Sequence, residues 1–161
     1  MNLYYGLKSI SQAKELAITV CNCLGHGKDG SAYDLILETA CSETHLGQYE
    51  DPKPNGAGRG LTQLDPVAVT TINEKRTPTA IRDRQKVLKC FDIDVWEVNP
   101  KDLDNNPLLA LIMCRLHYKQ VPDEIPSTVE ARAVYWKRYY NTSSGKGTER
   151  HYIEQVNRLL K

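Results

Sequence analysis

Apolar residues recur along the chain at the three- and four-residue spacing of amphipathic helices. In the first such segment Ile10, Ala13, Ala17, Val20 and Leu24 share one side, and Gly25 then provides a stop. The same pattern, read together with capping residues and prolines, predicts five further helices over about 31–42, 67–73, 78–91, 127–140 and 149–160. The chain therefore consists mainly of short helices.

One further segment has a different pattern. Residues 108–114, which follow Asn106 and Pro107, are apolar on every side, as expected for a helix buried in the middle of a domain. Prolines and glycines between 52 and 60 exclude long regular elements there. We expect a mostly α fold: one domain spanning residues 1–161, with a buried central helix and at most a small β-element after Glu43.

Composition narrows the possible partners. The chain has 21 basic and 20 acidic residues, so it lacks the overall positive field of many nucleic-acid-binding proteins. No apolar run reaches the roughly 18 residues that a membrane span needs. The N-terminal segment is predicted to be an amphipathic helix rather than a secretory signal. We expect a monomer without nucleic-acid partner or membrane span, made in the cytoplasm without a signal peptide.

The five cysteines are odd in number and mostly lie in helical patterns, which favours free, buried thiols formed in a reducing compartment. Cys21, Cys23 and His26 have a spacing rich in metal ligands. Residues two apart on a helix point to different sides, however, so we expect no metal site and no cofactor.

Two glutamates belong to the second predicted helix, and helical geometry separates them. At about 100° per residue, Glu43 lies about 20° from Ile36, on the face that packs inward. Glu38 lies about 160° from Ile36, on a polar stripe with Ser31, Asp34 and Ser42 that we expect to be solvated. Burial and the negative end of the helix should raise the pKa of Glu43, as a general acid requires. The alternative is a capping or ion-paired glutamate.

The segment around Glu43 resembles a known signature. Residues 42–47 (SETHLG) and 58–66 (GRGLTQLDP) resemble the Glu-Ser and Gly-Leu-Met-Gln elements of lytic transglycosylases and goose-type lysozymes. Thr44 here replaces the serine, and Thr62 replaces the methionine. Residues 139–141 (YYN) with Gly145 resemble the Tyr-Asn-Ala-Gly element of the transglycosylases. The tail from 135 to 148 is similar to small phage and prophage proteins with this domain.

The resemblance implies a lysozyme-like fold and cleavage of the β-1,4 bond between N-acetylmuramic acid and N-acetylglucosamine in peptidoglycan, with Glu43 as general acid and base. In a muramidase reaction water would attack the sugar, and in a transglycosylase reaction the sugar's own 6-hydroxyl would attack. The sequence does not decide between the two reactions. Glu50 and Asp51 are candidates for a second carboxylate, with solvated loop charges as the alternative. Asp65 is more simply a helix cap.

The resemblance also suggests neighbours for Glu43. Tyr140 would assist catalysis by hydrogen bonding to Glu43 or to the developing charge, although its place on an inward stripe also fits core packing. The other expected substrate contacts are Thr44, His45, Gly58, Gly60, Gln63 and Asn141. The alternatives are a plain turn for 58–63, a backbone hydrogen bond for Thr44 and a helix cap for Asn141.

The same resemblance suggests a phage or prophage endolysin, or a lysin associated with the virion. Its partner would be the glycan strands of peptidoglycan, reached in the periplasm or cell wall after release or injection. Two other functions remain open. One is a catalytically inactive glycan-binding or structural module of a phage particle, and the other is a chitinase-like glycosidase on the same scaffold.

Overall fold

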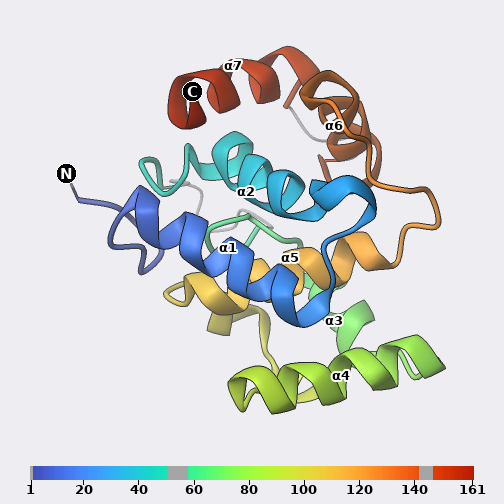
Figure 1. Cartoon of the computed structure of the whole chain (residues 1–161). Helices are drawn as coiled ribbons and strands as arrows, with labels where there is room; N and C mark the ends of the chain where they lie inside the picture. The colour runs from blue at the N-terminus through green and yellow to red at the C-terminus, as the bar shows by residue number, and fades with distance from the viewer. Residues whose placement is uncertain (1, 51–57, 142–146) are drawn as a thin grey trace.

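Helices make up most of the chain that the computed structural model describes, which comprises residues 2–50, 58–141 and 147–161 (Figure 1). The α-helices are α1 (Ile10–Leu24), α2 (Ser31–Thr44), α3 (Pro66–Glu74), α4 (Pro78–Phe91), α5 (Pro107–Lys119), α6 (Val129–Trp136) and α7 (Glu149–Leu160). The shorter turns are η1 (Lys28–Gly30), η2 (Val95–Glu97), η3 (Pro100–Leu103) and the π-helical η4 (Lys137–Asn141). The predicted mostly α class is confirmed.

Side-chain caps begin most of these helices, as the sequence predicts. The capping residues that accept a backbone N–H of the first turn and precede a proline are Asp65, Thr77 and Asn106. Thr148 caps α7 by accepting from the backbone N–H of His151 at 3.1 Å. The cap of α6 is Thr128, which accepts from Ala131 N at 3.2 Å, so this helix begins at Val129, two residues after the start predicted at about 127.

Helix α5 lies in the middle of the fold. Every residue from Leu109 to Leu116 is buried, which confirms the expected central helix. Helix α1 packs along α5, while α2 and α3 also contact it. In Figure 1, α2, α6 and α7 lie on one side of the α1–α5 pair, and α3 and α4 lie on the other.

The prediction for Glu38 is wrong. Its side chain is buried and forms a two-pronged ion pair with Arg132 of α6, at 2.7 and 2.9 Å, and it also accepts from the Tyr152 hydroxyl at 2.8 Å. The stripe expected to be solvated is covered because α6 and α7 pack on that side of α2. Ser31 and Ser42, on the same stripe, are buried too.

The prediction of free thiols is wrong for two of the five cysteines. Cys23 of α1 and Cys90 of α4 form a disulfide, with their Cα atoms 6.4 Å apart. Cys21, Cys41 and Cys114 are free and buried, as expected. Burial raises the pKa of the Cys21 thiol to about 11, which keeps that thiol neutral. The disulfide covalently joins α4 to α1.

The β-structure of the described chain is an isolated antiparallel bridge between Arg59 and Leu64, which agrees with the small β-element expected after Glu43. None of the described helices combines the length and the apolar character needed to cross a membrane.

Candidate functional site

Glu43 lies in the last turn of α2, which ends in a run of left-handed residues. His45, Leu46 and Gly47 all have positive φ, at 50°, 53° and 80°. The backbone N–H groups of His45 and Leu46 both return to the carbonyl of Ala40, so the helix closes in a compact C-terminal turn. Glu43 is thereby held on a rigid helix end and not on a loop.

The carboxylate of Glu43 accepts a hydrogen bond from an indole. Trp136 Nε1 lies 3.0 Å from Glu43 Oε2. Trp136 is only 1% exposed and packs on the ring of Tyr152, with ring centroids 5.3 Å apart. The donor is therefore fixed by the packing of α6 against α7, and it orients the half-buried carboxylate of Glu43.

A hollow of about 330 Å³ opens beside Glu43. Its described lining comes from the end of α2, from α6 and η4, and from the beginning of α7: Ser42, Glu43, Trp136, Asn141, Gly147 and His151. Most of these side chains carry a hydrogen-bonding group, which suits a ligand rich in hydroxyls and amides.

Four lining residues of this hollow were not predicted as site residues: Ser42, Trp136, Gly147 and His151. Ser42 is 6% exposed, and its hydroxyl has no hydrogen-bond partner among the described residues. His151 Nε2 donates to the carbonyl of Ser42 at 3.1 Å, which positions the imidazole at the rim. Ser42 was placed on the solvated stripe and His151 was assigned no role, because the approach of α7 to α2 is not visible in either local pattern.

The turn around the Arg59–Leu64 bridge is anchored from three sides. Thr44 Oγ1 donates to the Leu61 carbonyl at 2.7 Å, and the Tyr140 hydroxyl donates to the Thr62 carbonyl at 2.7 Å. Arg59 pairs with Asp104 at 3.0 Å. The turn thus ties α2, η4 and the segment after η3 together.

Gly60 has a structural reason to be glycine. Its φ is +74°, and a Cβ at this position would lie 2.5 Å from the carbonyl oxygen of Leu103. A Cβ at Gly58 would likewise lie 2.6 Å from Gln63 Oε1. Both glycines are therefore explained by close packing within the protein, and neither lines the described hollow.

The expectation of a direct substrate contact by Thr44 is corrected. Its side chain is fully buried, and besides the bond to Leu61 its hydroxyl contacts Ala40 O at 3.2 Å and accepts from Gly47 N at 3.1 Å. A group enclosed in this way cannot reach a ligand. Thr44 instead holds the turn 58–64 against the end of α2, in line with the alternative of a backbone hydrogen bond.

Gln63 is also engaged within the protein. Its amide Nε2 donates to the Gly60 carbonyl at 2.9 Å and to the Tyr5 hydroxyl at 3.3 Å, and its backbone is left-handed with a φ of 48°. The described lining of the hollow does not include it. The structure thus does not bring Gln63 together with Glu43 on one lining surface.

Tyr140 is half-buried and lies near enough to Glu43 to feel its charge. Its ring stacks on Tyr118, with centroids 5.3 Å apart, and meets His117 edge-on at 5.2 Å. Burial raises the pKa of the Tyr140 phenol well above its usual value, and the nearby Cys114 and Glu43 raise it further. The phenol is neutral, and its single O–H is donated to Thr62 O, so in this structure Tyr140 supports the turn.

The remaining predicted residues have separate places. His45 is half-buried, its ring centroid lies 5.7 Å from that of His151, and its pKa is lowered, first by burial and then by Arg158. Asn141 lines the hollow and accepts from Lys137 Nζ at 2.8 Å. Glu50 is exposed, and Asp51 lies outside the described residues.

Asp65, which could also have been a second carboxylate, accepts from Val67 N at 2.8 Å and is the expected helix cap.

In the described part of the chain no group of three or more His, Cys, Asp and Glu side chains is arranged to hold a metal ion.

Comparison with known proteins adds no relative. No protein-family model matches the chain, no curated protein matches it, and no solved structure matches it. The functional argument therefore depends on the chain's own residues and their geometry.

Proposed function

We propose that this protein cleaves the β-1,4 bond between N-acetylmuramic acid and N-acetylglucosamine in peptidoglycan, with Glu43 as general acid and base. The observation that carries the proposal is the placement of Glu43: a half-buried carboxyl at the wall of a polar hollow, oriented by the indole of Trp136. The sequence resemblance to lytic transglycosylases and goose-type lysozymes supplies the substrate class.

The chemistry asks one carboxyl group to protonate the glycosidic oxygen as the bond breaks. Glu43 would donate that proton from its protonated form and would then accept one from the attacking hydroxyl. The Trp136 N–H stabilises the carboxylate that results from the first step. Among the described residues the lining of the hollow contains no carboxylate besides Glu43, and the candidate Asp51 lies outside them, so product analysis decides between attack by water and attack by the sugar's own 6-hydroxyl.

The polar residues around Glu43 would bind the sugar. The Asn141 amide and the His151 ring, which line the hollow, are suited to the hydroxyl and acetamido groups of an amino sugar. The proposed substrate places the site of action in the bacterial cell wall. The Cys23–Cys90 disulfide supports an oxidising site of action, such as the periplasm.

The test is turnover of purified peptidoglycan by the full chain and by Glu43→Gln. General acid catalysis contributes about 10²- to 10⁴-fold, so we expect Glu43→Gln to lower the rate at least about 100-fold while the fold stays intact. The matched control is Glu130→Gln, which removes an exposed carboxylate on α6 and should leave the rate unchanged. Equal rates for the wild type and Glu43→Gln would refute the proposed role.

Product analysis separates the remaining alternatives. Mass spectrometry of the released muropeptides distinguishes 1,6-anhydro ends, which a transglycosylase makes, from reducing ends, which a hydrolase makes. Chitin oligomers in a parallel assay test the chitinase-like alternative. Retention of the wild-type protein on peptidoglycan without any cleavage would instead identify a glycan-binding module and overturn the enzymatic proposal.

A further inference from the structure

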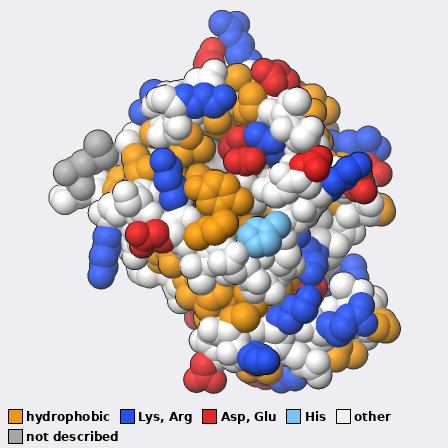
Figure 2. All heavy atoms as spheres, viewed as in Figure 1, with side chains coloured by type: hydrophobic (Ala, Val, Ile, Leu, Met, Phe, Trp, Pro, Cys, Tyr) orange, Lys and Arg blue, Asp and Glu red, His pale blue; other side chains and the backbone are white. Residues whose placement is uncertain are grey.

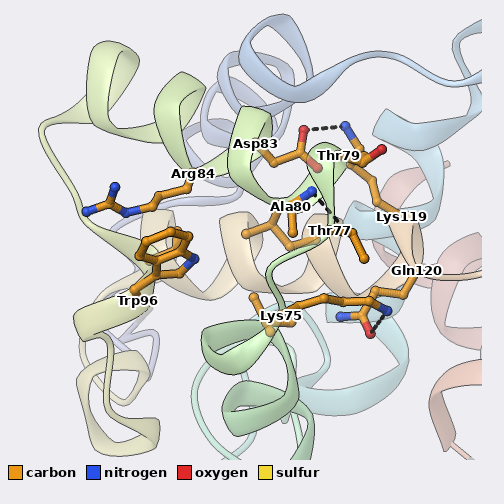
Figure 3. A pocket seen from close by; sticks show the side chains of 12 residues that line it. Lys75, Thr77, Thr79, Ala80, Asp83, Arg84, Trp96, Lys119 and Gln120 are labelled. Carbon is orange, nitrogen blue, oxygen red and sulfur yellow. Dashed lines mark hydrogen bonds and ion pairs between the residues drawn. The ribbon is translucent and has the colours of Figure 1, made fainter.

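A second cavity, of about 310 Å³, lies among α3, α4, η2 and the end of α5 (Figure 3). Helix α4 packs mainly on α1 and η2, and the space between α4 and the end of α5 stays open. The cavity shares no lining residue with the hollow beside Glu43. Its volume is at the lower end of the range for small-molecule sites.

The two ends of this cavity differ in chemistry. At one end lies Trp96, whose ring is covered by the guanidinium groups of Arg76 and Arg84, at 3.6 and 3.9 Å from the ring centroid. In Figure 3, Trp96 and Arg84 lie at one side of the cavity, whereas Lys75, Lys119 and Gln120 lie away from them. Apolar walls come from Ile72, Val95 and Leu116.

Of the three described basic side chains that line the cavity, two are paired with a carboxylate. Lys119 is neutralised by the buried Asp83 at 2.8 Å, and Arg84 by Asp94 at 2.6 Å. Lys75 has only the neutral amide oxygen of Gln120, at 3.5 Å, and no carboxylate partner within the described ranges. One cation lining the cavity is therefore available to an incoming anion.

One wall of the cavity, helix α4, is rich in basic residues. Residues 75–90 include six basic side chains and one acidic side chain, Asp83, whereas the whole chain has 21 basic and 20 acidic residues; Glu74 and three acidic residues between 92 and 97 flank this range. Arg82, Lys86 and Lys89 are spaced by four and three residues, so they share one exposed face of α4. Figure 2 shows basic side chains gathered over the part of the molecule where Figure 1 draws α4. The positive charge of this face would attract anions toward α4.

We propose that this cavity binds a small organic carboxylate with a flat apolar body. The carboxylate pairs with Lys75, while the apolar body packs against Ile72, Val95 and Leu116 toward Trp96. This site is independent of Glu43, so its ligand binds equally to the wild type and to Glu43→Gln.

The chain offers an internal reporter for the test, because it contains two tryptophans and each lies at one of the two sites. Benzoate is the probe, titrated into the full ¹⁵N-labelled protein at constant ionic strength while both indole N–H signals are followed. We expect saturable movement of the Trp96 signal, with the Trp136 signal unchanged. Benzyl alcohol, which has the ring without the charge, and inorganic phosphate, which has charge without the ring, should each bind at least about fivefold more weakly.

Two variants and one control make the result specific. Lys75→Gln should weaken benzoate binding about tenfold or more, because it removes the positive charge that pairs with the carboxylate. Lys161→Gln, which makes the same charge change at the end of α7, should have no effect. Ala80→Leu keeps every charge but adds bulk to the cavity wall, and should also weaken binding.

Several results would overturn the proposal. They are an unmoved Trp96 signal, movement of the Trp136 signal instead, benzyl alcohol or phosphate binding as tightly as benzoate, and unaltered benzoate binding in folded Lys75→Gln or Ala80→Leu.

Discussion

Trp136 and Glu43 lie 93 positions apart in the chain, and a hydrogen bond of 3.0 Å joins the indole Nε1 of the first to the carboxylate of the second. The indole is buried against Tyr152, so the orientation of Glu43 depends on the packing of α6 and α7. Each end of this hydrogen bond is thus fixed by a different helix. The proposed acid is positioned by the C-terminal third of the fold, far in sequence from its own helix.

Replacing Trp136 with phenylalanine should lower the rate of catalysis. The variant loses the N–H that orients the Glu43 carboxylate and stabilises it after proton donation. A hydrogen bond to a charged group is worth about 1.5–3 kcal/mol, so we expect kcat per folded molecule to fall about 10- to 100-fold. A variant that loses Tm but keeps the wild-type kcat per folded molecule would show that Trp136 acts through stability alone.

Replacing Glu38 with glutamine should affect stability and not chemistry. The change leaves the buried guanidinium of Arg132 without its counter-charge, and breaking such a pair costs about 3 kcal/mol. Urea unfolding of Glu38→Gln beside Glu130→Gln measures the loss. A rate per folded molecule as low as that of Glu43→Gln would mean that Glu38 takes part in the reaction.

Replacing Tyr140 with phenylalanine tests whether this residue supports the turn or takes part in catalysis. The change leaves the Thr62 carbonyl without its donor, and we expect a stability loss of about 1–2 kcal/mol. Because the phenol O–H is already donated, kcat should fall less than about tenfold at temperatures where the variant is folded. A fall of about 100-fold or more at full stability would instead assign Tyr140 to catalysis.

Reducing the disulfide should destabilise the chain. Cys23 and Cys90 are 67 residues apart, and the loop-closure entropy of a cross-link of that span is about 4 kcal/mol. For a domain of this size the loss lowers Tm by about 10 °C, measured by calorimetry with and without dithiothreitol. A Cys23→Ser, Cys90→Ser double variant should have the Tm of the reduced wild type, both with and without dithiothreitol. Equal Tm values for the reduced and oxidised wild type would contradict this.

Stability should fall on mild acidification because of two histidines. The pKa values of His45 and His117 are lowered below the ordinary 6.5, in both cases mainly by burial. The unfolded chain therefore takes up protons first, and stability is lost as pH falls from about 6.5 through the lower folded values. Urea unfolding between pH 7.5 and 5 should show the slope, and His117→Gln should reduce it. Arg84 lowers the pKa of Asp94 below its usual value, so Asp94 contributes to the loss of stability only at more acidic pH.

The helix positions could be predicted because their signals are local. Asp65 and Pro66 stand side by side in the sequence, and so do Asn106 and Pro107, and each pair begins a helix in the structure. The apolar sequence of α5 likewise predicts, on its own, that this helix is buried. Local patterns of this kind account for the mostly α fold and for the inward side of α2.

Side-chain contacts between residues far apart in the sequence could not be predicted in this way. Glu38 meets Arg132 and Tyr152, which are 94 and 114 residues away, and a helical projection of α2 contains neither. The indole of Trp136 offered one usable signal, since a buried Trp N–H needs an acceptor. An odd number of cysteines pointed to free thiols, yet it is also compatible with one disulfide and three thiols.

The π-helical turn η4 accommodates one more residue than a regular α-turn would, between Trp136 and the residues that follow it. The helical phase that connects Val129, Ala133 and Trp136 therefore does not carry on unchanged to Tyr140. A chain with one residue fewer in this turn would continue as a regular helix and present a different side chain to the Thr62 carbonyl. When such a chain is aligned with this one, the gap belongs inside residues 137–141 and not after them.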